Sequence, residues 1–388
     1  MIRDKTRLDA LIADIREFVR EHWHPIEDEV ERLDEVPQPV VQELRRRGYF
    51  GWSIPEAYGG LGLTTEELVS CAFELSQASV ALRARVGTNT GIGSEALVAD
   101  GTEEQKSRWL PRMATGELTG CLALTEPEAG SEATNVQTVA RRDGDHYILD
   151  GTKRFITNAP IADVFTVLAR TEDGTRGSAG TSAFIVERGT PGMRTGEPYR
   201  KMGQAGSPVS DVYFENCRVP AANLIGGREG VGFQTVMKVL NKQRLHLAAL
   251  CTGPAIRMLD LAIDHTQARK QFGQAVGNFQ LLQAMVADSQ TEIFAAKSMI
   301  IETARARDRG EDVAMTASMC KYFASEMCGR VADRCVQMFG GSGYVADFSP
   351  IERYFRDVRL FRLYEGTSQI HQLNIAKLVL REREKAAP

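Results

Sequence analysis

The feature that most constrains this chain of 388 residues is that its hydrophobic periodicity changes twice. Residues 1–117 carry apolar side chains at helical spacing, for example at Leu8, Leu11 and Ile12. From residue 118 to 227, short alternating runs rich in Gly and Thr predict closely spaced strands, and from residue 228 the helical period returns. We therefore expect an α+β multidomain protein with an N-terminal α-helical bundle (1–117), a central barrel or sandwich (118–227) and a C-terminal four-helix bundle (228–388).

Local signals place several elements within these regions. Two capping-box pairs, Thr64 with Glu67 and Thr102 with Gln105, predict helix starts. The dipeptide at 143–144 (Asp-Gly) predicts a β-hairpin turn, and that at 150–151 predicts another turn. The C-terminal periodicity predicts helices at about 231–266, 279–309, 313–339 and 365–384.

Composition and charge exclude several classes of protein. A content of 43% hydrophobic and 25% charged residues argues against disorder and fibrous structure. The net charge of −4, without a long basic run, indicates no nucleic-acid partner. No apolar run reaches eighteen residues and the N-terminus lacks the apolar core of a signal peptide, so we expect no membrane span and a cytoplasmic protein.

The cysteines and histidines do not suggest a metal site. The seven cysteines include no CxxC pair and are expected to be buried free thiols of a reducing compartment. The six histidines are scattered, and His22 and His24 are too close in sequence to share one helical face.

Three segments rich in glycine or hydroxyl groups are candidates for ligand contact. Residues 124–131 (Leu-Thr-Glu-Pro-Glu-Ala-Gly-Ser) follow a predicted strand and form either a backbone nest for a phosphate or planar ring, or a plain turn. Residues 337–343 (Gln-Met-Phe-Gly-Gly-Ser-Gly) form either a helix C-cap or a close backbone approach to a phosphate. Residues 153–158 (Lys-Arg-Phe-Ile-Thr-Asn) pair an aromatic ring with a hydroxyl, which is also common in an ordinary strand.

Two charged segments complete the candidates. Residues 269–273 (Arg-Lys-Gln-Phe-Gly) place Arg269 either on a pyrophosphate or at a solvated helix end. Residues 364–370 (Tyr-Glu-Gly-Thr-Ser-Gln-Ile) place Glu365 at a predicted helix start. A carboxylate there either stabilises the helix dipole or acts as a general base.

In this order and spacing, the five segments resemble the acyl-CoA dehydrogenase family, over about residues 5–383. The resemblance implies that the central region is a β-barrel between two helical bundles and that the cofactor is FAD. It implies oxidation of a saturated acyl-CoA thioester to the trans-2-enoyl-CoA, in fatty acid and lipid metabolism. It also implies a homotetramer that passes electrons to an acceptor such as an electron-transfer flavoprotein.

The resemblance also assigns roles to individual residues. In the central region, the residues expected to contact the flavin are Leu122, Leu124, Thr125, Gly130, Ser131, Phe155, Ile156 and Thr157, with Gly130 and Ser131 also near the substrate chain. The residues expected to reach the pyrophosphate and adenosine from a partner subunit are Arg269, Gln271, Phe272, Gln280, Gln337, Gly340 and Gly341. Thr367 and Gln369 complete the cofactor pocket, and the substrate is expected to contact Ser131, Asn241, Arg244, Glu365 and Gly366.

The same resemblance makes Glu365 the catalytic base, which removes the α-proton while the flavin takes the β-hydrogen as hydride. A minority of relatives carry this carboxylate where this chain has Gln243, so only Glu365 can serve here. The α-proton of a thioester is far too weakly acidic for an ordinary carboxylate. We therefore expect a raised pKa at the base and hydrogen bonds to the thioester carbonyl, which the family supplies from the Glu365 amide and a flavin ribityl hydroxyl.

Departures from the family pattern leave alternatives open. Asn241 replaces a common aspartate, Ala205 a frequent arginine and Val209 a frequent hydroxyl residue. These changes keep open a dehydrogenase acting on an acyl-carrier-protein thioester. Two further alternatives are an acyl-CoA oxidase and a non-catalytic, flavin-holding relative, although the retained Glu365 argues against the latter.

Arg83 offers one further substrate signal. It lies close to the position at which related glutaryl-CoA dehydrogenases bind a distal carboxylate with an arginine. The alternative is an arginine on a helix face or in an ion pair between subunits. We expect an uncharged acyl chain.

Overall fold

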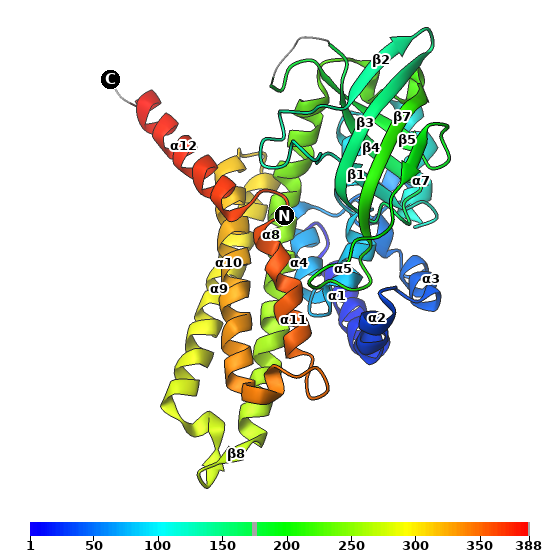
Figure 1. Ribbon diagram of the computed structural model, residues 1–388. Helices are drawn as coiled ribbons and strands as arrows, with labels where there is room; N and C mark the ends of the chain where they lie inside the picture. The colour runs from blue at the N-terminus through cyan, green and yellow to red at the C-terminus, as the bar shows by residue number, and fades with distance from the viewer. Residues whose placement is uncertain (173–176, 387–388) are drawn as a thin grey trace.

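The computed structural model describes residues 1–172 and 177–386 and confirms the predicted succession of a helical region, a sheet and a second helical region (Figure 1). The α-helices before the sheet are α1 Lys5–Phe18, α2 Glu27–Leu33, α3 Gln38–Arg46, α4 Thr65–Leu75, α5 Val80–Gly87, α6 Glu95–Asp100 and α7 Glu103–Ala114.

Both predicted capping boxes form, at the starts of α4 and α7. The Thr64 hydroxyl accepts a hydrogen bond from the N–H of Glu67, and the Glu67 carboxylate accepts one from the N–H of Thr64. Thr102 and Gln105 make the same exchange. Each pair satisfies two N–H groups that a helix start would otherwise leave without partners.

The central region is a curled sheet of seven strands: β1 Gly120–Ala123, β2 Val139–Asp143, β3 His146–Thr157, β4 Val164–Arg170, β5 Thr181–Glu187, β6 Met193–Thr195 and β7 Val209–Pro220. The strand order is β1-β4-β2-β3-β7-β6, and β5 pairs with β4. β1 pairs with β4 in parallel, whereas β3 pairs antiparallel with both β2 and β7. Its core buries Phe165, Phe184 and Phe214.

One of the two predicted turns is wrong. The hairpin turn at 143–144 is confirmed, because Asp143 faces His146 across β2 and β3. At 150–151, however, β3 continues without a turn, and its pairing with β7 shifts register between Leu149 and Gly151. Gly151 serves close packing: its φ is 152°, and a Cβ there would lie 2.5 Å from Thr138 Oγ1.

The helices after the sheet are α8 Gly232–Ala268, α9 Gln280–Asp308, α10 Ala314–Phe339, α11 Ile351–Val358 and α12 Ser368–Ala386. The sequence predicts four long helices, and the structure adds the short α11. The expected helix start at residue 365 is wrong. Glu365 (φ 53°) and Gly366 (φ 94°) both have left-handed backbone, so α12 begins only at Ser368.

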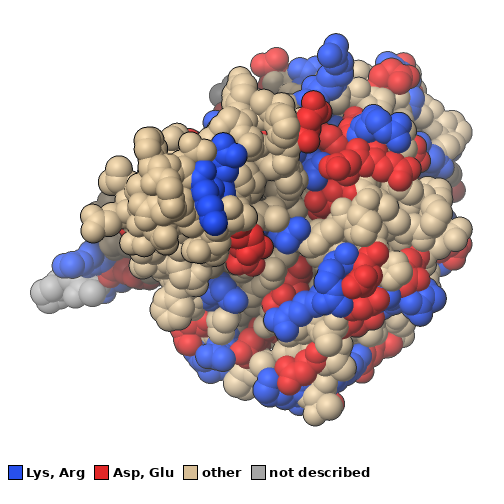
Figure 2. All heavy atoms as spheres, turned by 90° about the horizontal axis from the view of Figure 1, so that it is seen from below, with Lys and Arg blue, Asp and Glu red and all other residues tan. Residues whose placement is uncertain are grey.

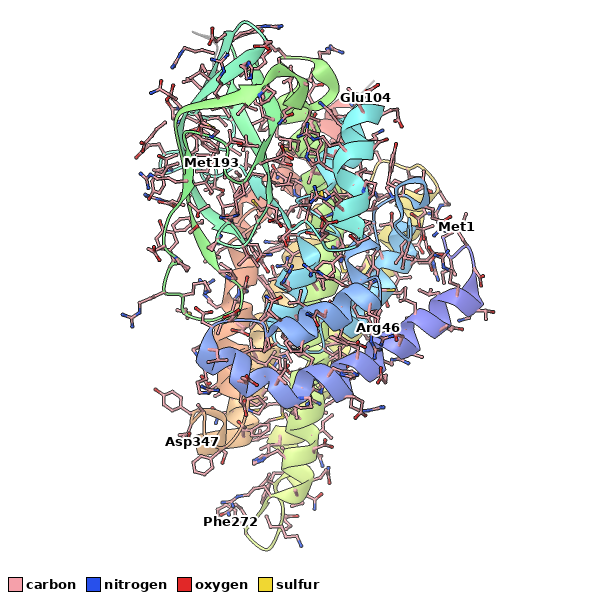
Figure 3. All side chains as sticks on the ribbon, turned by 90° about the vertical axis from the view of Figure 1, so that its right-hand side faces the viewer. Met1, Arg46, Glu104, Met193, Phe272 and Asp347 are labelled. Atoms are coloured by element: carbon pink, nitrogen blue, oxygen red, sulfur yellow. The ribbon has the colours of Figure 1, made fainter. Side chains whose placement is uncertain are left out.

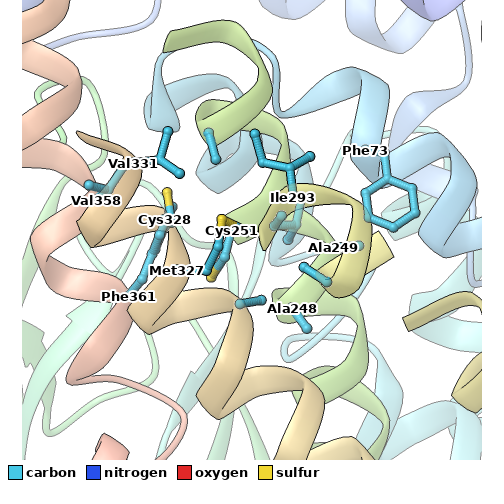
Figure 4. Close-up of a cluster of buried hydrophobic side chains, with 14 of the residues drawn as sticks. Phe73, Ala248, Ala249, Cys251, Ile293, Met327, Cys328, Val331, Val358 and Phe361 are labelled. Carbon is cyan, nitrogen blue, oxygen red and sulfur yellow. The ribbon is translucent and has the colours of Figure 1, made fainter. Parts of the chain in front are cut away.

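The helices α8, α9 and α10 lie side by side and α12 extends away from them, while the two-stranded ribbon β8 Lys270–Gln271 and β9 Gln274–Ala275 forms the end of the bundle remote from the sheet (Figure 1). The bundle core packs Phe73 of α4 with Cys251, Ile293 and Cys328 of the three long helices (Figure 4). All seven cysteines are free and buried, as predicted.

Helix α8 passes through this core. By length and composition it is the one helix among the described residues that is apolar enough to cross a membrane, and 72% of its most apolar stretch is buried inside the protein. Such burial is typical of a core helix.

Candidate functional site

A cavity of about 800 Å³ lies where the sheet meets the C-terminal helices. Its wall is formed by α5, the loop after β1, the end of β3, the first half of α8, the segment that precedes α12 and the first turns of α12. The predicted residues that line it are Leu122, Leu124, Thr125, Gly130, Ser131, Phe155, Ile156, Thr157, Arg244, Glu365 and Gly366. The folding thus brings together residues that are up to 244 positions apart in the chain, and the cavity size is typical of a cofactor or substrate site.

A buried ion pair holds the loop after β1 in place. Lys153 Nζ lies 2.7 Å from Glu126 Oε1, with the two side chains only 0% and 2% exposed. Glu126 also accepts hydrogen bonds from the N–H groups of Gln137 and Thr138, and the N–H of Arg154 donates to the carbonyl of Thr125. Burial raises the pKa of Glu126, but the charge and hydrogen bond of Lys153, together with the hydrogen bonds of Thr138 and Gln137, outweigh it, so the net shift is downward and the carboxylate stays ionised.

Phe155 presents an open aromatic surface beside this loop. It is 62% exposed, has φ 58°, and its ring centroid lies 5.6 Å from that of Tyr199. A large residue in the left-handed region is strained, and such strain is concentrated at functional sites. An exposed ring on a cavity wall is a suitable surface for a planar ligand.

Glu365 places a carboxylate on the cavity wall, which Glu132 also lines. Its Oε1 lies 3.8 Å from Arg83 Nη2, and its Oε2 is buried without a hydrogen-bond partner among the described residues. Burial raises the pKa of Glu365, and the positive charges of Arg83, Lys321 and Arg244 offset only part of that rise. The result is a carboxylate that binds a proton more strongly than one in water.

The two arginines of the cavity wall have different partners. Arg83 packs over the Tyr364 ring, 5.2 Å from its centroid, besides its contact with Glu365 in the same chain. Arg244 donates to Asn241 Oδ1 at 2.9 Å, while Asn241 itself does not line the cavity.

Gln243 lines the same cavity as Glu365, beside a histidine that the sequence patterns do not single out. His246 Nδ1 lies 3.2 Å from Gln243 Oε1. Burial lowers the pKa of His246 to about 3, so this histidine is neutral and donates through Nδ1. Gln243 and His246 therefore add polar but uncharged groups to the cavity wall, on either side of Arg244.

A second cavity, of about 660 Å³, collects most of the residues predicted to act on a partner's cofactor: Arg269, Gln271, Phe272, Gln337, Gly340 and Gly341. It shares no residue with the first cavity and lies at the end of the bundle that carries β8, where Figure 3 labels Phe272. Phe272 is 94% exposed, at φ 51°. One chain alone does not bring these residues to Glu365.

Besides Asn241, three residues predicted to contact the cofactor line neither cavity. Gln280 and Gln369 are exposed, and Thr367 caps α12 by accepting a hydrogen bond from the N–H of Ile370 at 3.2 Å. Their predicted contacts with the cofactor stay predictions. Among the residues that the structure describes, no cluster of His, Cys, Asp and Glu is arranged to hold a metal.

Comparison with known proteins matches the chain over nearly its whole length. Three family models match in order: the N-terminal domain of acyl-CoA dehydrogenases over residues 6–117, the middle domain over 121–217 and the C-terminal domain over 230–380. A 3-(aryl)acrylate reductase of Clostridium sporogenes is 40% identical over 367 residues, which is 94% of this chain and 96% of the relative.

Two further relatives cover the chain to the same extent. The caffeyl-CoA reductase-Etf complex subunit CarC of Acetobacterium woodii is 38% identical, over 92% of this chain and 93% of its own. The butyryl-CoA dehydrogenase structure from Megasphaera elsdenii superimposes with a TM-score of 0.93 at 30% identity, covering 98% of this chain and 100% of the other.

Proposed function

The chain belongs to the acyl-CoA dehydrogenase family, FAD-dependent oxidoreductases acting on CH–CH bonds, and on that premise we propose that it oxidises a saturated acyl-CoA thioester to the trans-2-enoyl-CoA with Glu365 as the base. The single observation that carries the proposal is the buried Glu365 carboxylate on the wall of the main cavity, which has a raised pKa and an oxygen without a hydrogen-bond partner in the described part of the chain.

The residues of the main cavity fit FAD. Leu122 and Ile156 supply apolar surface, Phe155 an open ring, and Thr125 and Thr157 hydroxyl groups. The buried, unpartnered Oε2 of Glu365 indicates that the cavity is built to receive a further group. FAD bound there supplies the oxidant that takes the β-hydrogen as hydride.

The environment of Glu365 suits it to removing an α-proton. A base is most effective when its pKa approaches that of the group it deprotonates and when it still ionises at the working pH. Burial raises the pKa of Glu365 towards that of the α-proton, and the charges of Arg83, Lys321 and Arg244 limit the rise so that the carboxylate still ionises. Gln243 on the same wall cannot replace it, because an amide does not accept the proton.

A second candidate function is the reverse reaction, reduction of an enoyl thioester, which the names of two relatives support. Glu365 would then return the proton to Cα, and a raised pKa favours that role equally. The electron partner decides the direction. We propose an electron-transfer flavoprotein as that partner, on the strength of the relative that is named as part of such a complex.

We also propose a homotetramer, in which the second cavity of one chain completes the cofactor site of another. Figure 2, seen from below, shows a broad surface with few charged residues over the end of the C-terminal bundle. The exposed apolar side chains of that end include Phe272, Leu281, Tyr344 and Phe348. Such a surface is characteristic of a protein contact.

Anaerobic flavin reduction tests the catalytic proposal. Mixing the purified flavoprotein with butyryl-CoA is expected to bleach the flavin, and Glu365→Gln is expected to slow this by about 10²-fold or more while FAD and ligand still bind. The same acyl chain on a carrier protein distinguishes the two thioester classes. A Glu365→Gln variant that bleaches at wild-type speed would refute the assignment of the base.

A further inference from the structure

Two fully buried basic side chains bind the two consecutive peptide carbonyls of the strained turn that carries Glu365. Lys321, from the first third of α10, donates from Nζ to the carbonyl of Gly366 at 2.6 Å. His371, from the first turn of α12, places Nε2 3.2 Å from the carbonyl of Glu365. A carbonyl oxygen only accepts, so His371 carries its proton on Nε2.

The turn needs such support because its backbone is unfavourable. Glu365 has φ 53°, which a residue with a Cβ adopts only at a cost, whereas the following Gly366 adopts φ 94° without one. Helix α10 also binds the neighbouring residues, since Glu326 Oε1 accepts from the Ser368 hydroxyl at 2.5 Å. A Cβ on Gly366 would lie 3.0 Å from His371 Nε2, so the turn and the imidazole are packed together.

The two basic side chains differ in charge. Burial, and then the positive charges of Lys321 and Arg244, lower the pKa of His371 to about 3, so it is neutral. Burial lowers the pKa of Lys321, and the Glu365 carboxylate is among the groups that offset part of that shift. Lys321 forms no ion pair within the described part of the chain, and in its charged form it lowers the pKa of Glu365. Burying a lysine ammonium group that binds only a carbonyl costs free energy of folding, because the charge loses its hydration without gaining a counter-ion. Such a cost suggests that the charge has a functional role.

The charged and titratable groups that face Glu365 come from each surrounding element. Arg83 lies on α5, Arg244 on α8 and Lys321 on α10, and all three lower its pKa against the effect of burial. His371 on α12 is neutral, and burial keeps the adjacent Tyr364 protonated. Arg83 contacts the side chain of Glu365, whereas Lys321 also donates a hydrogen bond to a backbone carbonyl of the turn.

Resting on the proposed role of Glu365 as the base, we propose that Lys321 and His371 are its positioning residues: together they hold the left-handed turn that projects the carboxylate into the cavity. Neither residue lines the cavity, so neither touches the substrate. The hydrogen bonds support the rate at high pH, and the charge of Lys321, together with those of Arg83 and Arg244, lowers the pH above which the base is active.

Three variants separate the two effects. Lys321→Met removes the hydrogen bond and the charge. Flavin reduction by butyryl-CoA at high pH is expected to fall by about 10-fold to 100-fold, with the dissociation constant of butyryl-CoA little changed, and the acid limb of the pH profile is expected to move to higher pH. Lys321→Gln removes the charge but keeps a donor for the Gly366 carbonyl. Its acid limb is therefore expected to move in the same direction, while its rate at high pH, the plateau of the pH profile, falls less than in Lys321→Met.

His371→Leu completes the set. The histidine is neutral, so its loss is expected to lower the plateau without moving the acid limb. The matched control is Lys238→Met, an exposed lysine of α8 paired with Asp100, which is expected to change neither quantity.

The apoprotein gives a readout that does not depend on activity. The infrared band of the protonated Glu365 carboxyl, identified by its loss in Glu365→Gln, reports the pKa of Glu365 as the pH is varied. That pKa is expected to be higher in both Lys321 variants than in wild type and unchanged in His371→Leu.

The inference would be overturned if the acid limb does not move in either Lys321 variant. It would also be overturned if the rate of flavin reduction at high pH stays within twofold of wild type in Lys321→Met, Lys321→Gln and His371→Leu. If Lys321→Met does not fold, Lys321→Gln and the apoprotein titration still decide it. If Glu365→Gln reduces its flavin normally, the proposed function fails. If Glu365→Gln is inactive and the Lys321 variants behave as wild type, only the positioning role fails.

Discussion

Replacing Lys153 by methionine is expected to loosen the loop after β1, which lines the main cavity, and to destabilise the sheet. Lys153 and Glu126 are 0% and 2% exposed and 2.7 Å apart, so the substitution leaves a carboxylate buried without its cation. Breaking a buried pair in this way typically costs about 3–5 kcal/mol. The hydrogen bonds from Gln137 and Thr138 to Glu126 remain, which places the expected loss near the lower end, about 3 kcal/mol.

The assay is a double-mutant cycle of Lys153→Met, Glu126→Gln and the double variant, read by urea unfolding and by the dissociation constant of FAD. The double variant is expected to be more stable than Lys153→Met, because it removes the uncompensated charge. Arg154→Met is the matched control on the next residue of β3. Its partner Asp211 is 3.4 Å away and the arginine is 38% exposed, so little change is expected. A Lys153→Met protein with wild-type stability and FAD affinity would refute the role assigned to the pair.

Three further outcomes follow from the geometry. Arg83→Ala removes a cation that lowers the pKa of Glu365, so the acid limb of flavin reduction is expected to move to higher pH, checked by stopped-flow with butyryl-CoA. Gly151→Ala is expected to lower stability by about 1–3 kcal/mol more than Gly144→Ala, measured by thermal unfolding: both positions have positive φ, but only at Gly151 does a Cβ clash with Thr138, whereas at Gly144 it meets nothing within 4 Å. All seven cysteines are expected to resist alkylation by iodoacetamide until the protein unfolds, because every thiol is buried; rapid labelling of the native protein would contradict this.

Sequence reasoning performed best where the signal is local. The capping pairs beginning at Thr64 and Thr102 predict α4 and α7 because each box is made within four consecutive residues. The prediction of a turn at 150–151 is wrong because a glycine required for close packing against Thr138 looks the same in sequence as a glycine required for a turn. The start of α12 at residue 365 is wrong because the periodic pattern does not report the φ angle of Glu365.

The candidate site was predictable through its resemblance to a family, but its supporting residues were not. Lys153 and Lys321 stand in ordinary strand and helix patterns, and only their burial, at 0% exposure each, distinguishes them from solvated lysines. Burial of a charge depends on contacts between distant segments, such as Lys321 with Gly366. The segregation of residues 269–272 and 337–341 into a cavity of their own likewise depends on the length and packing of α8 and α10.

The two separate cavities have a consequence for handling the enzyme. If each cofactor is bound partly by the second cavity of a neighbouring chain, FAD binding and assembly are thermodynamically linked, and each must strengthen the other by the same factor. Diluting the enzyme would then release flavin before any chain unfolds, and added FAD would reassemble it. Specific activity would rise with protein concentration at fixed FAD, and preparations that lose their colour on dilution would be recoverable rather than denatured.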